Sequence, residues 1–225
     1  MNKMPNTAYY RLSLTLLQQL LEGAGYDNWI AWLNEDLRLW DENQSTEHHL
    51  RAYGGMGSFN DVIIGSNDTQ GLWKGRVFGM IQSLAYGLAQ KNIDTAPLDP
   101  SFYGSASEIL SGWRCRACGH AILNEVQLEQ YLAGYFLPIF MVNYLKEDKL
   151  SALLAVENLI NSVEVVAKRE AISQLIQQSN IELTTNNQWH WTCPRCQSTE
   201  TCSYRWELHE DGTGLFEAAD NLDML

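Results

Sequence analysis

The sequence predicts a mainly α fold, in which a helical body carries a small β element with two cysteine pairs. Two observations predict it: apolar residues recur at helical spacing in most segments, and two C-x-x-C pairs with turn-forming residues lie in the second half. Hydrophobic residues make up 45% of the 225 residues and charged residues 19%, which is typical of a globular protein with a real core.

Three helices are predicted before the middle of the chain. The first runs over about Ala8–Glu22, with leucines on one face and Gly23 as its C′ residue. The second has Asp27 as a candidate N-cap and repeats apolar side chains at helical spacing over Trp29–Trp40, so the two form a helical hairpin. The third spans roughly Leu72–Lys91.

A glycine-rich loop, Tyr53–Asp61, precedes the β-branched run Val62–Ile64, which we expect to be β structure. The loop has no G-K-[ST] and comes before the apparent strand, unlike a phosphate-binding loop, so its glycines are interpreted as turn residues with positive φ. Thr95–Ser101, with two prolines, is the clearest linker. It divides a helical domain, residues 1–94, from a second domain, residues 101–225.

The second domain is predicted to hold its helices between the two cysteine pairs, in an insertion over residues 121–180. Helices are expected over Glu125–Leu145 and Lys149–Gln178, and the latter is long enough that we expect a break near Asn161–Ser162. The remaining β structure is expected at Ile181–Thr184 and in a closing hairpin, Tyr204–His209 with Leu215–Ala218.

Four cysteines form two pairs, Cys115/Cys118 in W-R-C-R-A-C-G-H and Cys193/Cys196 in W-T-C-P-R-C-Q. Four thiolates suit a tetrahedral zinc ion, and C-x-x-C lets one tight knuckle present two sulfur atoms to one metal. The pairs resemble the two halves of a zinc ribbon. We therefore predict one structural Zn²⁺ held by all four cysteines, with no open coordination position and so no catalytic role.

The spacing of the pairs departs from that of an ordinary zinc ribbon, in which about 15–20 residues separate them. Residues 119–192 lie between them here, which a helical insertion would explain. Each pair could instead be an independent redox dithiol or have no function, although neither lies in the βαβ context of a thioredoxin-like motif. Cys202, His120 and His190 lie close by in sequence and could replace or support a ligand.

The chain carries a net charge of −12 and has a pI near 4.7. Nucleic acid and anionic membranes are poor partners for such a surface, because both bind through lysine and arginine. Met1–Tyr10 has no signal-peptide pattern, and the apolar stretch Gln130–Leu145 is too short to span a bilayer. We therefore expect a cytoplasmic protein with reduced cysteines.

Acidic residues cluster on the tryptophan-rich second helix, where they could steer a basic protein partner. Those taken as the candidate partner surface are Glu35, Asp36, Asp41 and Glu42. A second acidic run, Glu207–Asp223, contains no lysine or arginine after Arg205 and is either a solubilising tail or a further steering surface.

Two strings in the first half, W-I-A-W-L-N-E-D-L (Trp29–Leu37) and H-L-R-A-Y-G-G-M-G-S-F-N-D (His49–Asp61), resemble a family of small uncharacterised bacterial domains. Its members pair a helical hairpin with a G-G-M-G-S-[FL]-N-D segment, and the resemblance covers roughly Tyr9–Lys91. The family carries no assigned activity, and its domains resemble parts of toxin–immunity neighbourhoods, which is an association only.

Sequence motifs of catalysis are missing: neither G-x-S-x-G nor H-E-x-x-H occurs. His48 and His49 are interpreted as exposed or capping residues between a helix and a loop. The one cluster worth testing for chemistry is His49, Arg51, Asn60 and Asp61.

Two functions from different classes follow. The first is a non-catalytic, zinc-stabilised protein-binding protein, most specifically a bacterial immunity protein that neutralises a basic toxin. The second is an enzyme of unknown class with a polar site around the four residues just named.

Overall fold

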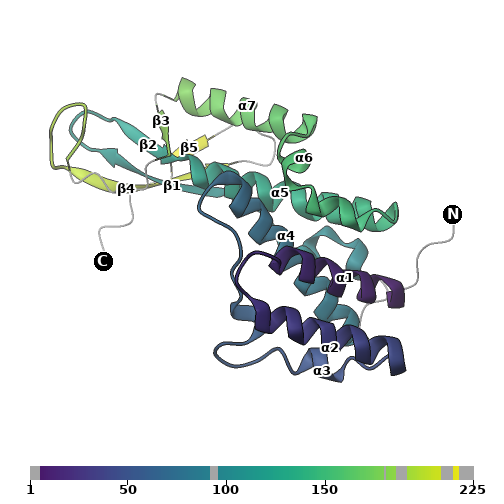
Figure 1. Ribbon diagram of the computed structural model, residues 1–225. Helices are drawn as coiled ribbons and strands as arrows, with labels where there is room; N and C mark the ends of the chain where they lie inside the picture. The colour runs from purple at the N-terminus through teal and green to yellow at the C-terminus, as the bar shows by residue number, and fades with distance from the viewer. Residues whose placement is uncertain (1–5, 92–95, 180, 186–191, 209–214, 218–225) are drawn as a thin grey trace. The chain divides into compact units, whose positions relative to one another are not determined.

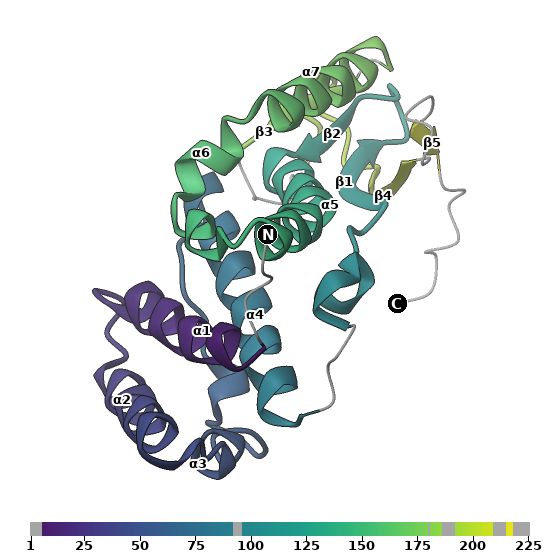
Figure 2. The same cartoon turned by 90° about the vertical axis from the view of Figure 1, so that its right-hand side faces the viewer.

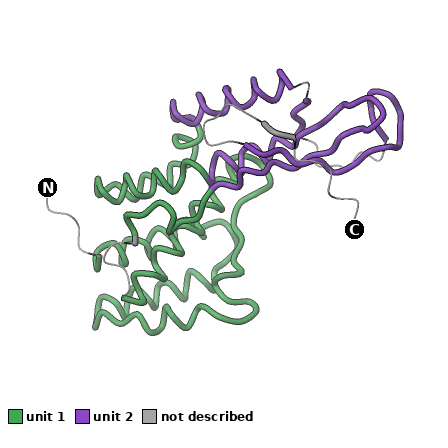
Figure 3. The backbone as a smooth tube through the Cα atoms, turned by 180° about the vertical axis from the view of Figure 1, so that it is seen from behind, with its two compact units in different colours: residues 1–105, 135–160 green, residues 106–134, 161–225 purple. Residues whose placement is uncertain are grey.

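The computed structural model describes residues 6–91, 96–179, 181–185, 192–208 and 215–217. The chain forms two compact units, each built from two stretches of sequence (Figure 3). Unit 1 comprises residues 1–105 and 135–160, and unit 2 comprises residues 106–134 and 161–225. The boundary between them falls inside one helix, α5 (Glu125–Lys146). The domain ranges expected from the sequence, 1–94 and 101–225, stay a prediction about which segments fold together.

The regular secondary structure in the described residues of unit 1 is all helical (Figure 1). Its elements are α1 (Asn6–Leu21), α2 (Asp27–Asn43), α3 (Glu47–Leu50), η1 (Phe59–Asp61), α4 (Thr69–Ala89), η2 (Ala96–Leu98), η3 (Pro100–Tyr103), the second half of α5, η4 (Leu150–Leu154) and α6 (Val156–Ile160).

The core of unit 1 forms where α1 packs against α2 and α4 (Figure 2). Leucines of α1 and apolar side chains of α4 recur every three or four residues, so each helix buries one continuous face. Leu14, Leu17, Trp73 and Ile81 are all fully buried there. Gly23, with φ +73°, follows the end of α1 and turns the chain back towards α2, which confirms the predicted helical hairpin.

Two local predictions in unit 1 are wrong. Val62–Ile64 pairs with no strand in the described chain; instead it is extended, with Val62 and Ile64 anchored in the core and Ile63 80% exposed. Buried and exposed side chains alternate along this segment as they would in a strand, but the buried ones pack into a helical core, so no partner strand is needed. Asp27 is the first residue of α2 and not its N-cap, which is Tyr26.

The β structure of unit 2 is a five-stranded sheet in the order β3-β2-β1-β4-β5 (Figure 1). The strands are β1 (Ile109–Cys115), β2 (Ala121–Asn124), β3 (Ile181–Thr184), β4 (Thr201–Leu208) and β5 (Leu215–Glu217). β1 pairs antiparallel with both β2 and β4, and β3 runs parallel to β2. β4 and β5 pair antiparallel, so the predicted closing hairpin is confirmed.

The helices of unit 2 come between the paired strands β2 and β3; the insertion expected over residues 121–180 begins with β2 itself, and its residues 135–160 belong to unit 1. The first half of α5 follows β2, and α7 (Val163–Gln178) leads into β3. The expected break is present, because α6 ends at Ile160 and α7 begins at Val163. Glu129 of α5, 5% exposed, accepts two hydrogen bonds from Arg169 of α7, at 2.6 and 3.0 Å. Within the described residues, no helix is long and apolar enough to span a membrane.

Candidate metal centre

The first knuckle, residues 115–120, connects β1 to β2 in a tight turn. The Gly119 N–H donates to the Cys115 carbonyl at 2.9 Å, and the Cys115 N–H donates to the His120 carbonyl at 2.8 Å. Gly119 has φ +74°, a conformation that a residue without a side chain adopts easily. Cys115 and Cys118 therefore lie on one turn whose backbone hydrogen bonds fix it at both ends.

The second knuckle, residues 193–198, repeats this geometry. The Gln197 N–H donates to the Cys193 carbonyl at 2.9 Å, and the Cys193 N–H donates to the Ser198 carbonyl at 2.8 Å. Gln197, at the position equivalent to Gly119, has φ +61°. Two segments far apart in the sequence thus adopt the same turn around the same pair of residues.

Strand pairing brings the two knuckles together. β1 pairs with β4 along its whole length, with Cys115 opposite Thr201, so the chain before β4 lies beside the first knuckle. The Arg116 N–H also donates to the Glu200 carbonyl at 2.8 Å. The four cysteines can therefore lie together despite their long separation in sequence, because both knuckles lie at one end of the same strand pair.

The four cysteine side chains form what we call the cysteine cluster: Cys115, Cys118, Cys193 and Cys196. Their Sγ atoms all lie within 4.8 Å of one another. The Cys115–Cys196 and Cys118–Cys193 sulfur pairs are 3.6 and 3.7 Å apart, well beyond the roughly 2.05 Å of a disulfide bond. All four cysteines are free, and the arrangement could hold a metal ion.

Apolar side chains pack against the two buried cysteines of the cluster. Cys115 and Cys193 are fully buried and pack with Trp113 and Ile122, whereas Cys118 and Cys196 are exposed. Each knuckle thus contributes one sulfur atom from the core and one from the surface. The same burial protects part of the cluster from water and holds its geometry.

Neighbouring groups make the thiols of the cluster unequal. Burial alone raises the pKa of Cys193, but hydrogen bonds from the N–H groups of Cys196 and Arg195 and from nearby thiols outweigh it and lower the pKa to about 7. The N–H of Ser198 favours the Cys196 thiolate, but the other cysteines and burial outweigh it and raise the pKa to about 12. The proton of Cys193 therefore leaves more easily than that of Cys196, whose thiolate would be repelled by negative charge on the neighbouring sulfur atoms. A bound cation would remove that repulsion.

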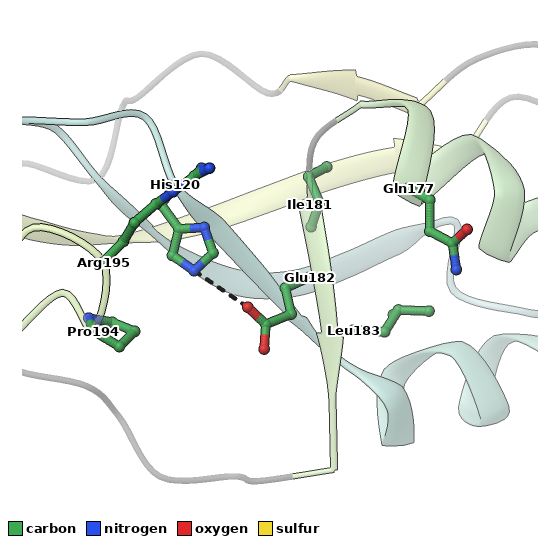
Figure 4. A pocket seen from close by; sticks show the side chains of 7 residues that line it. All are labelled: His120, Gln177, Ile181, Glu182, Leu183, Pro194 and Arg195. Atoms are coloured by element: carbon green, nitrogen blue, oxygen red, sulfur yellow. Dashed lines mark ion pairs between the residues drawn. The ribbon is translucent and has the colours of Figure 1, made fainter.

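The other candidate ligands stay outside the cluster. Cys202 Sγ lies 3.6 Å from the Arg114 carbonyl oxygen and is not among the grouped sulfur atoms. His120 Nε2 lies 3.4 Å from Glu182 Oε2, and both residues line a pocket of about 660 Å³ between the second knuckle and β3 (Figure 4). His190 lies outside the described residues.

Arginines of α1 and α2 pair with most of the acids that were expected to form the partner surface on α2. Arg38 hydrogen-bonds Glu35 and Glu42, and these contacts raise the pKa of Arg38. Arg11 forms a two-hydrogen-bond ion pair with Asp41 and lowers the pKa of that carboxyl. The exposed charge of α2 is therefore smaller than its sequence suggests. Most of the second acidic run, Glu207–Asp223, lies outside the described residues.

Asp36 has to be removed from that surface, because its side chain is buried. It accepts hydrogen bonds from His48 Nδ1 at 2.5 Å and His49 Nδ1 at 2.8 Å, and Tyr53 Oη lies 3.2 Å from His49 Nε2. We call these four residues the Asp36 cluster. The interpretation of the two histidines as exposed or capping residues is wrong, since His49 is buried and His48 stacks on Trp32 at 4.2 Å.

Sequence reasoning missed the Asp36 cluster although the signal was present. The inward positions of α2 recur at Leu33, Leu37 and Trp40, and residue 36 is three residues after 33 and four before 40. Helical periodicity therefore places Asp36 on the inward face and its neighbour Glu35 outside it.

The four residues of the alternative enzyme site have separate surroundings. His49 belongs to the Asp36 cluster, and Arg51 is exposed with Glu47 at 4.0 Å. Asp61 accepts hydrogen bonds from the N–H groups of Gly57 and Ser58 and so closes the glycine-rich loop. Asn60 is exposed, and no hydrogen bond or ion pair joins any two of the four in the described chain.

Comparison with known proteins gives one match. Residues 22–71 match a family described as a domain of unknown function (DUF6966). The matched segment contains α2, α3, the glycine-rich loop and the whole Asp36 cluster, and it includes both strings on which the family resemblance was based. The chain matches no curated protein. It also matches no solved structure.

Proposed function

We propose that the cysteine cluster binds one structural zinc ion and that the protein is a non-catalytic protein-binding protein stabilised by it. One observation carries the proposal: two knuckles with the same backbone hydrogen bonds bring four sulfur atoms within 4.8 Å of one another. A turn of this kind is how zinc knuckles present paired cysteines.

The sulfur spacing supports zinc. Four sulfur atoms at about 2.3 Å from a tetrahedral zinc ion are about 3.8 Å from one another. The two cross-knuckle distances, 3.6 and 3.7 Å, lie close to that value. Four protein ligands also leave no position for water or substrate, so the metal would supply folding energy and not catalysis.

The finer proposal is that the partner is a basic protein, most specifically a toxin that this chain neutralises as an immunity protein. Its support is the net charge of −12. Because Arg38 and Arg11 already pair with three acids of α2, we place the attraction in the acidic surface as a whole and not in α2 alone. Long-range steering needs only the summed charge.

Affinity capture at two salt concentrations tests the partner. The full chain is immobilised with its metal and offered extracts of its own cells at about 0.05 M and about 0.5 M salt, since screening weakens steered association. We expect a basic protein to be captured at low salt and largely lost at high salt. Co-expression then asks whether the captured protein is harmful to cells alone and harmless with this chain.

The comparison variant is Glu35→Gln, Asp41→Asn, Glu42→Gln, which removes the three exposed acids of α2 that pair with arginines and leaves Asp27 and Asp36 in place. Reduced capture by this variant places part of the interface on α2. Capture of only acidic or neutral proteins, or capture that does not change with salt, would overturn the basic-partner proposal.

A further inference from the structure

Each knuckle holds one buried and one exposed cysteine, and the exposed cysteine of each knuckle contacts the buried cysteine of the other. Exposed Cys196 contacts buried Cys115, with the sulfur atoms 3.6 Å apart. Exposed Cys118 contacts buried Cys193, with the sulfur atoms 3.7 Å apart. Every surface sulfur thus has a core sulfur of the other knuckle within contact distance.

From this arrangement we infer that the cysteine cluster is also an oxidation site, at which a hydroperoxide converts the cluster into disulfides that join the two knuckles. The inference rests on the proposed zinc site, because metal binding keeps the sulfur atoms as thiolates, and the thiolate is the nucleophile. Cys118 and Cys196 would react first, since only they are exposed.

The chemistry balances with hydrogen peroxide as the oxidant. The exposed thiolate attacks one oxygen of the peroxide, the O–O bond breaks, and the products are a sulfenic acid and hydroxide. The buried thiolate of the other knuckle then attacks that sulfur, a disulfide forms and a second hydroxide leaves. Two thiolates have lost two electrons, and the peroxide, after taking up two protons, has become two molecules of water.

Two sulfur–sulfur contacts join the knuckles, so a disulfide between the knuckles needs little movement. A sulfur pair at 3.6 or 3.7 Å has to close by only about 1.6 Å to reach disulfide length. Each cross pair, like each pair within a knuckle, contains one cysteine that peroxide can reach and one that can complete the bond, so the sulfur contacts between the knuckles decide which disulfide we expect. Loss of two of four ligands releases the metal, while the new bond still ties the two knuckles together.

Peptide mapping of the zinc-loaded full chain tests the inference. Arg116 and Arg195 lie inside the two pairs, so trypsin separates Cys115 from Cys118 and Cys193 from Cys196. Cys196 and Cys202 stay on one tryptic peptide, and the variant Cys202→Ser removes that ambiguity. The chain is treated with one equivalent of hydrogen peroxide, free thiols are alkylated, and released zinc is measured with a coloured chelator.

We expect zinc release together with a Cys115–Cys196 or Cys118–Cys193 linkage, a loss of about 2 Da for each disulfide, and recovery on adding a thiol reductant. Linkages within a knuckle, Cys115–Cys118 or Cys193–Cys196, would overturn the inference, as would retained zinc with all four thiols still free.

Zinc content before peroxide treatment separates this inference from the proposed function. If the purified chain holds no zinc, the zinc proposal fails, and with it the premise of protected thiolates. If zinc is present and the linkages are wrong, only the oxidation inference fails.

Discussion

Asp36 accepts hydrogen bonds from two consecutive histidines. Whether an acid of α2 is buried or exposed depends on the face of the helix on which it lies. Its neighbour Glu35 is half-exposed and binds Arg38, whereas Asp36 is 1% exposed and joins α2 to α3. A buried carboxylate without partners is very unfavourable, so the two imidazole N–H groups are what make this position possible. The cluster also lies wholly within the segment that matches the uncharacterised domain.

Replacing Asp36 tests that account at the residue scale. Asp36→Ala should lower the free energy of unfolding by about 3 kcal/mol, because the buried N–H donor of His49 and the partly buried one of His48 lose a charged acceptor. The matched control, Glu35→Ala, removes an acid one residue away and should change stability little, since exposed ion pairs contribute little. Urea denaturation measures the free energy of unfolding of both variants. Equal losses would show that the hydrogen bonds of Asp36 stabilise the protein no more than the exposed ion pair of Glu35 does.

Residues in the knuckles were predictable because their signal is local. The C-x-x-C pattern identifies all four cysteines without any knowledge of their neighbours, and the structure brings these four together. The position of Cys202 and the pairing of His120 with Glu182 depend on strands that meet in space, so the sequence left both residues open as ligands.

At the scale of elements, the two knuckles are equivalent turns that differ at one position. Gly119 and Gln197 both have positive φ and both donate to the carbonyl of the first cysteine of their pair. A Cβ added at Gly119 would meet nothing within 4 Å, so a substitution there tests backbone conformation alone. The left-handed conformation disfavours side-chain-bearing residues by roughly 1–2 kcal/mol.

Gly119→Gln should therefore lower the free energy of unfolding by about 0.5–1 kcal/mol, because the cost of a left-handed residue with a side chain exceeds the gain from a less flexible unfolded chain. The reciprocal variant, Gln197→Gly, should raise it by a similar or smaller amount, because relief of the turn is partly offset by greater freedom of the unfolded chain. Denaturation of the metal-loaded variants measures both. A stabilising Gly119→Gln would contradict the assigned turn geometry.

Helices were predicted well and strands less well, for a physical reason. Helical spacing is a property of a continuous segment, and the break at Asn161–Ser162 fell where the sequence placed it. Strand identity depends on a partner, so the β-branched run Val62–Ile64 was misread. The parallel pairing of β3 with β2 joins residues far apart in sequence, and no local pattern indicates it.

The whole molecule places its cysteine cluster in one compact unit. All four cysteines belong to unit 2, and the described residues of unit 1 contain no comparable group of metal ligands. Unit 1 combines residues 1–105 with residues 135–160. The domain prediction was based on the proline-containing linker Thr95–Ser101, and such a local signal cannot indicate that a later segment folds with the first one. The metal should therefore stabilise one unit directly and the other little.

Hydrogen exchange after metal removal tests that division. A strong chelator should sharply reduce the protection of β1 and β4, because the knuckles at their ends lose the metal. The internal control is α4, whose side chains fill the core of unit 1 and whose amides should stay protected. Equal loss of protection in α4 and β1 would mean that the metal stabilises the chain as a whole.

The most direct test of the central claim is X-ray absorption at the zinc edge, combined with metal analysis of the purified chain. We predict one zinc ion per chain, surrounded by four sulfur atoms at about 2.3 Å, and loss of that zinc in the double variant Cys115→Ser, Cys193→Ser. Nitrogen or oxygen atoms in place of any of the four sulfur atoms, or full zinc content in the double variant, would contradict the assigned site.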